Sequence, residues 1–178
     1  MRGNKGFESY RICLILIAIG FYWPVHFAIA QQDTFFRIGQ TSLGELDMKS
    51  YAKDSSAEAV ILADYGLSRL IKDDIRGYMT IYRRYTRIKI LKKSAYNYAN
   101  ISVPFYRFSA NQEEIVRDIQ ARTYNLKDGS MQYQEMGKSA IFEEKRSDKV
   151  YLSKFTLPNI HEGSVIEYSY TIESDLVS

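Results

Sequence analysis

Residues 164–173, Ser-Val-Ile-Glu-Tyr-Ser-Tyr-Thr-Ile-Glu, alternate between bulky and polar side chains more cleanly than any other part of the chain. One parity carries four large residues: Ile166, Tyr168, Tyr170 and Ile172. The other parity carries Glu167, Ser169 and Thr171. Because neighbouring side chains of a β-strand point to opposite faces of the sheet, this alternation predicts a strand with one buried and one polar face.

The same signal recurs through the preceding sequence. Alternating or continuously apolar runs predict further strands at residues 59–63, 78–91, 99–103, 115–126, 130–133 and 150–157. Asp128-Gly129 lies between two of these runs and predicts a tight hairpin turn, because both turn positions need a positive φ. Short strands with little helical periodicity predict one all-β domain, an antiparallel β-sandwich, over residues 57–178 of the 178-residue chain.

Within residues 78–91, the side chains on one face of the predicted strand are basic, and those on the other face are aromatic or apolar. Its basic residues are Arg83, Arg87 and Lys89, and its other parity holds Tyr82, Ile88 and Ile90. A platform for single-stranded nucleic acid is one interpretation, and a solvated face opposite a buried one is the other. The chain has 24 Lys and Arg against 21 Asp and Glu, and residues 1–30 hold three of these basic residues and one acidic residue. The remaining net charge of +1 favours the solvated face and gives no case for nucleic acid or an anionic membrane.

Residues 1–30 have the pattern of a secretory signal peptide. Basic residues precede the apolar run Ile12–Phe21, Pro24 follows it, and Ala28-Ile29-Ala30 supplies the small residues that a signal peptidase reads. We therefore predict cleavage before Gln31 and an extracytoplasmic location, periplasmic or secreted. An uncleaved anchor is the alternative, since the uncharged stretch could just span a bilayer, but Pro24 and the Ala-x-Ala ending disfavour it.

Residues 31–56 form a segment that leads into the predicted sandwich. Within it, Ser42-Leu43-Gly44-Glu45 has the spacing of a capping box, in which a serine and a glutamate satisfy each other's backbone N–H groups. This spacing predicts a short helix on the surface of the domain.

The mature sequence has no recognisable catalytic motif, so we predict no catalytic, cofactor-binding or metal-binding residue. The one cysteine, Cys13, lies in the leader, which leaves no disulfide, thiolate metal site or cysteine nucleophile after cleavage. His161, the one histidine after cleavage, lies in a connection between predicted strands and has no partner at ligand spacing. Three adjacent carboxylate pairs face opposite sides of any strand that holds them, so none forms a two-carboxylate site by itself. They are Asp73-Asp74, Glu113-Glu114 and Glu143-Glu144.

Several segments occur together, in the same order, in a known family. They are residues 54–62, 87–91, 99–101, 157–160 and 163–170. Over roughly residues 41–174 the chain resembles domain of unknown function family 3857, the N-terminal domain of exported bacterial proteins that carry a transglutaminase-like domain behind it. The resemblance implies an immunoglobulin-like β-sandwich and a papain-like neighbour with a cysteine, a histidine and an aspartate. The family's first domain usually runs on past Ser178, so the sandwich is expected to lack its last strands.

These expectations lead to two functional hypotheses. The first is a non-catalytic accessory domain, which positions or shields a transglutaminase-like neighbour or contacts its substrate. The second is a stand-alone module that binds carbohydrate or peptide through some of the thirteen tyrosines of residues 31–178. Because strands would be missing beside residues 164–173, we also expect an open sheet edge there and self-association through it. No membrane contact is expected after signal cleavage.

Overall fold

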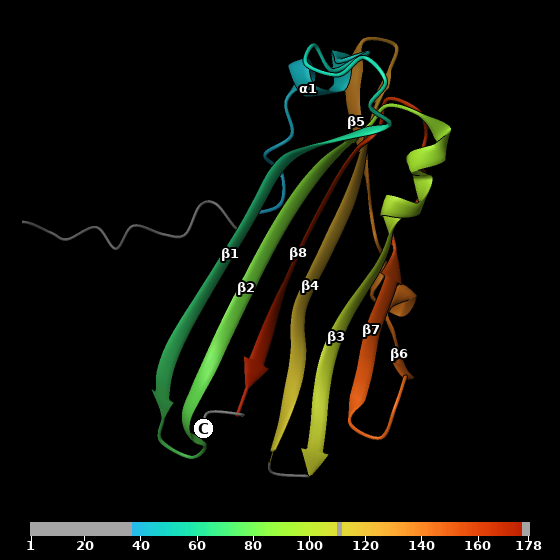
Figure 1. Cartoon of the computed structure of the whole chain (residues 1–178). Coiled ribbons are helices and arrows are strands. Elements are labelled where there is room, and N and C mark those ends of the chain that lie inside the picture. The colour runs from blue at the N-terminus through green and yellow to red at the C-terminus, as the bar shows by residue number, and fades with distance from the viewer. Residues whose placement is uncertain (1–36, 110–111, 176–178) are drawn as a thin grey trace, which may run out of the picture. The chain divides into compact units, whose positions relative to one another are not determined.

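The computed structural model describes residues 37–109 and 112–175, and Figure 1 shows how their strands are arranged. The helical elements are α1 (Leu43–Asp47) and two 3₁₀ segments, η2 (Lys93–Ala99) and η3 (Lys138–Ala140). The strands are β1 (Ala59–Asp73), β2 (Gly77–Ile90), β3 (Asn100–Ser109), β4 (Gln112–Lys127), β5 (Ser130–Glu135), β6 (Phe142–Lys145), β7 (Val150–Thr156) and β8 (Val165–Ser174). The predicted signal peptide and its cleavage residues Ala28, Ala30 and Gln31 lie outside the described residues.

All neighbouring strands are antiparallel, in the order β1-β2-β8-β4-β3-β7-β6, and β5 pairs with β4. Strands β3 and β4 pair only where β3 ends and β4 begins, with Arg107 opposite Glu113 and Ser109 opposite Gln112. Away from these ends they separate into two leaves (Figure 1). The large leaf is β1-β2-β8-β4-β5 and the small leaf is β3-β7-β6.

The core lies between the two leaves. Phe155 of β7 meets Tyr168 of β8 edge to face, with ring centroids 6.2 Å apart. The buried cluster around this contact draws on both leaves and on the segments that join them: Ile88, Ile90, Ala95, Ala99, Val103, Ala121, Phe155, Leu157, Ile166, Tyr168 and Tyr170. The predicted all-β, antiparallel sandwich is therefore confirmed.

The predicted N-terminal helix is also confirmed. The Ser42 side chain accepts a hydrogen bond from the Glu45 backbone N–H at 3.3 Å, and the Ser42 N–H donates to the Glu45 carboxylate at 2.7 Å. This is the capping box that the sequence spacing indicated. Leu46 of α1 is buried against Tyr124 and Val165 of the large leaf, so α1 packs on one end of that leaf.

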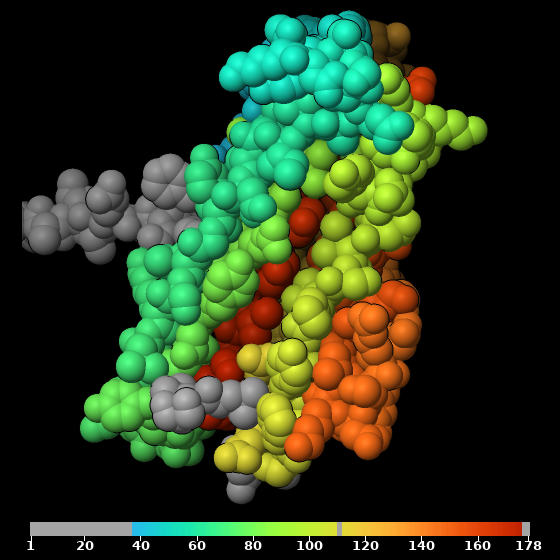
Figure 2. Space-filling view, in the orientation of Figure 1, coloured from blue at the N-terminus to red at the C-terminus, as the bar shows by residue number. Residues whose placement is uncertain are grey.

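The expectation that residues 164–173 border an open edge is wrong. β8 pairs with β2 along one side, from Thr80 opposite Ser174 to Lys89 opposite Val165. It pairs with β4 along the other side, and Figure 2 shows its red atoms between β2 and the strands coloured yellow. The expectation rested on further strands that the family resemblance implies after residue 178. In the structure, β8 instead lies between two strands from earlier in the chain.

The boundaries of β1 also differ from the prediction. The sequence Asp64-Tyr65-Gly66 predicted the end of the first strand, but β1 continues through Gly66 to Asp73. The Tyr82 hydroxyl lies 3.1 Å from the position that a Cβ at Gly66 would take. Gly66 thus leaves room for a tyrosine side chain from the neighbouring strand and does not mark a turn.

Candidate functional site

The outer face of β2, β8 and β4, which points away from the core, holds the most elaborate polar arrangement among the described residues. At its centre is Glu167 of β8, whose side chain is completely buried. Register places Arg87 of β2 and Arg122 of β4 directly opposite Glu167 on either side. The sequence parity placed Glu167 on the polar face of this strand, and the structure buries its side chain on that face.

Five hydrogen-bond donors converge on the Glu167 carboxylate. The Gly39 and Gln40 backbone N–H groups donate at 2.7 and 3.0 Å, and the Thr41 hydroxyl donates at 2.9 Å. The Tyr85 and Tyr124 hydroxyls each donate at 2.9 Å from the flanking strands. A buried carboxylate is tolerated when its oxygens are satisfied in this way.

Residues 37–47, which we call the strap, cross the sheet at this point. Gly39 has φ +108°, a conformation that side chains other than glycine rarely adopt, and it brings two successive N–H groups onto one carboxylate. Arg87 adds charge compensation, because its guanidinium lies 3.6 Å from Glu167 and 3.0 Å from Glu45 of the strap. Glu167 therefore fixes the strap to the sheet.

Burial and the nearby Glu167 charge both raise the pKa of Tyr85 and of Tyr124 well above the usual value for tyrosine. Desolvation of the phenolate is the larger cause in each case. The two phenols consequently stay protonated and remain donors to Glu167 throughout the physiological pH range.

Lys89 makes a second connection to the strap. Its side chain is fully buried, and its ammonium donates to the Leu46 carbonyl at 2.7 Å and to the Gly163 carbonyl at 2.5 Å. Burial and, as a smaller cause, the nearby charge of Lys49 lower the pKa of Lys89 to about 8. The predicted solvated face of Arg83, Arg87 and Lys89 is therefore wrong at Lys89 and Arg87, which the strap covers.

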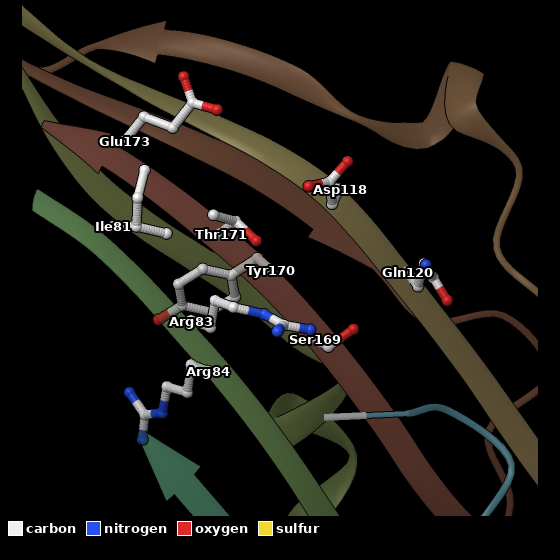
Figure 3. Close-up of a pocket in the computed structure, with 9 residues that line it drawn as sticks. All are labelled: Ile81, Arg83, Arg84, Asp118, Gln120, Ser169, Tyr170, Thr171 and Glu173. Atoms are coloured by element: carbon white, nitrogen blue, oxygen red, sulfur yellow. The ribbon is translucent and has the colours of Figure 1, made fainter. Parts of the chain in front are cut away.

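Beyond the strap, the same face opens into a hollow of about 400 Å³ (Figure 3). Its lining is mostly polar: Ile81, Arg83, Arg84, Asp118, Gln120, Ser169, Tyr170, Thr171 and Glu173. These residues contain hydroxyl, amide, guanidinium and carboxylate groups, but no histidine, cysteine or lysine. The hollow is suited to binding a polar ligand through hydrogen bonds.

A β-bulge shapes one wall of this hollow. Asp118 has φ +52°, which is unusual for a residue other than glycine, and the β4 register shifts between Arg117 and Gln120. Two nearby cations are already paired: Arg117 with Glu173 at 3.1 Å, and Arg84 with Asp64 at 2.8 Å. Hydroxyl and amide groups consequently make up much of the remaining polar lining.

A second surface lies on the outer face of the small leaf. Tyr106 and Phe108 of β3 are exposed and stacked, with ring centroids 6.0 Å apart. The Lys149 ammonium lies 4.9 Å from the Phe108 ring centroid. We call Tyr106 and Phe108 the aromatic patch. Phe142 of β6 is also exposed, beside Lys154, but the register places it opposite the Ser102 end of β3. By contrast, Tyr168 and Tyr170 are buried, as their parity predicted.

The residues weighed as candidates from the sequence are not brought together. His161 lies in the connection before β8, where its backbone N–H donates to the Ser164 hydroxyl at 2.8 Å. Glu143 binds Arg107 at 2.9 Å, whereas the adjacent Glu144 binds Lys154 at 2.9 Å. Adjacent carboxylates thus serve different ion pairs, as strand geometry requires.

The described residues hold neither a metal-binding cluster nor a membrane-spanning helix. Within residues 37–109 and 112–175, no group of three or more His, Cys, Asp or Glu is placed to hold a metal ion. The same residues contain no helix with the length and apolarity needed to cross a membrane.

No protein-family model and no curated protein matches the chain. The resemblance to domain of unknown function family 3857 therefore stays a prediction. One solved structure is similar in fold: a crystal structure of a "putative protease" from Parabacteroides distasonis ATCC 8503, with a TM-score of 0.52 and 16% identity. The match covers 66% of this chain but 23% of that protein, so the chain spans less than a quarter of its length.

Proposed function

We propose that this chain is a non-catalytic accessory domain that works beside a transglutaminase-like or protease-like catalytic domain. The observation that carries the proposal is the unequal coverage of the structural match. Most of this fold corresponds to a minor part of a much longer chain, and that chain is named a "putative protease". The ordered segments shared with domain of unknown function family 3857 agree with this arrangement.

The physical character of the domain suits a positioning role. Glu167 and Lys89 tie the strap to the outer face of the large leaf through fully buried polar contacts. Such satisfied networks rigidify the elements that they join. The hollow beside the strap would then present a fixed polar surface to the catalytic neighbour or to its substrate.

The coding sequence that follows Ser178, together with the adjacent genes, tests this proposal. We expect a domain with a cysteine, a histidine and an aspartate in papain-like order, in the same frame or next to it. Joining that domain to this chain should change its kcat/KM for a protein substrate relative to the catalytic domain alone. Absence of any such domain, or an unchanged kcat/KM in the joined protein, would contradict the accessory role.

The aromatic patch favours one second candidate, a stand-alone module for carbohydrate or peptide. Exposed rings on a flat sheet face can stack against sugar rings. Binding of the full chain to purified peptidoglycan tests this candidate, with Phe108→Ala as the binding-site variant and the exposed Leu43→Ala as a control away from the patch. Binding that Phe108→Ala weakens at least about tenfold, with Leu43→Ala unchanged, would support the module; each tenfold loss corresponds to about 1.4 kcal/mol.

A further inference from the structure

The two ends of the strand order differ greatly in length. β6, at the end of the small leaf, has four residues, whereas β1, at the end of the large leaf, has 15. Within the part of the chain that the structure describes, β1 pairs with β2 alone. Long edges of this kind are templates for a further strand, and proteins usually keep them short or interrupt them.

Several large side chains near this edge are exposed to solvent. The exposed fractions are 41% for Tyr65, 61% for Leu70 and 39% for Ile71. The one register shift between β1 and β2 lies between Ile61 and Ala63, so the edge from Asp64 to Asp73 is free of bulges. This stretch is the part of β1 that another strand could follow without interruption.

We propose that a second copy of this chain pairs antiparallel along the bulge-free part of β1, with the twofold axis at Ser68. In such a dimer, the face of one copy's sheet continues into the same face of the other copy's sheet. An odd-numbered residue must then lie opposite an odd-numbered one, and an even-numbered residue opposite an even-numbered one. The twofold axis therefore passes through a residue and not between two residues. An axis at Ser68 sets Asp64, which also binds Arg84, opposite Lys72 and sets Tyr65 opposite Ile71. By symmetry, each of these two pairs occurs twice in the dimer. Opposite charges and aromatic–β-branched pairs are the cross-strand neighbours that stabilise sheets.

Neighbouring registers are less favourable. An axis at Arg69 would place two guanidinium groups directly opposite each other, and like charges in that position destabilise a pair of strands. An axis at Leu67 would set the Asp64 carboxylate opposite Leu70. The Ser68 register therefore follows from charge matching along β1, and the symmetric contact closes as a dimer.

Single cysteines test this register, because Cys13 is the one cysteine of the chain. In full-length protein carrying Cys13→Ser, Ser68→Cys would place two thiols opposite each other across the axis, within the range that a disulfide can bridge. In the matched variant Lys72→Cys, the two thiols would be eight residues apart, about 27 Å at 3.4 Å per residue. We expect mild oxidation to crosslink Ser68→Cys at least tenfold faster than Lys72→Cys.

Light scattering of the full-length chain provides a second test that requires no oxidation. Ser68→Lys would oppose two ammonium groups at the axis and should raise the dimer dissociation constant at least tenfold. Ser139→Lys, an exposed serine in η3, should leave it unchanged. Equal crosslinking of the two cysteine variants, or a chain that stays monomeric at millimolar concentration, would overturn the proposal.

Discussion

Replacing Glu167 with glutamine should release the strap and lower the free energy of unfolding by about 3–5 kcal/mol. The glutamine side chain has the same shape, but its NH₂ group is a donor and cannot accept from the donors that now meet Glu167. The carboxylate accepts five hydrogen bonds, from Gly39, Gln40, Thr41, Tyr85 and Tyr124. Hydrogen bonds to a charged group contribute about 1.5–3 kcal/mol each, and a buried donor left unsatisfied costs about 1–3 kcal/mol.

This magnitude assumes that two of the five bonds are lost and that the strap relaxes enough to rehydrate the others in part. Domains of this size are stable by about 5–15 kcal/mol, so the variant should fold but with a much smaller margin. Urea denaturation of the full chain, followed by tyrosine fluorescence and circular dichroism, measures the change. Hydrogen exchange of residues 37–47 should accelerate in parallel, because these residues lose their attachment.

Glu135→Gln is the matched control. Glu135 forms an ion pair with Arg122, also on the large leaf, but its side chain is 58% exposed. Exposed ion pairs contribute about 0–1 kcal/mol, so this variant should remain within about 1 kcal/mol of the wild type. If Glu167→Gln were equally mild and the strap still resisted exchange, Glu167 would not be the residue that holds the strap.

Three further predictions concern other parts of the chain. The pKa of Lys89 is lowered to about 8 in the folded chain, whereas an unfolded lysine titrates near 10.4, so the unfolded state binds more protons between these two pH values. In urea titrations, the stability of the wild type relative to Lys89→Met should therefore rise by about 1–2 kcal/mol from pH 8 to 9.5. A stability difference that does not change with pH would contradict the lowered pKa. Phe155→Ala should cost about 3–5 kcal/mol in thermal and urea unfolding because it opens a cavity between the leaves, whereas Phe142→Ala on the exposed face should cost less than about 1 kcal/mol. Intact-mass analysis of the exported protein should show Gln31 as the first residue, and a membrane-bound form that retains residues 1–30 would replace the signal peptide with an anchor.

Local sequence patterns predicted much of this fold. The parity of Ile166, Tyr168 and Tyr170 predicted their burial, and the spacing of Ser42 and Glu45 predicted the helix cap. These features depend on residues close together in the chain, where side-chain direction and turn chemistry are set locally. Asp128-Gly129 likewise joins β4 to β5, with a positive φ at both residues.

The candidate site could not be predicted in the same way. The donors to Glu167 come from residues 39–41, from Tyr85 and from Tyr124, which only the strand order brings together. Parity identified the face that Glu167 shares with Ser169 and Thr171, but not the strap that covers one end of it. The central place of β8 has the same origin, since pairing between residues 76 to 94 positions apart leaves no local pattern.

The measurement that bears most directly on the proposed function is the activity of the purified chain itself. Casein hydrolysis and the incorporation of a fluorescent amine into casein should both stay at the level of buffer, because catalysis is assigned to a neighbouring domain. Activity that survives purification and disappears in His161→Ala would contradict the accessory role and would identify this chain as the enzyme.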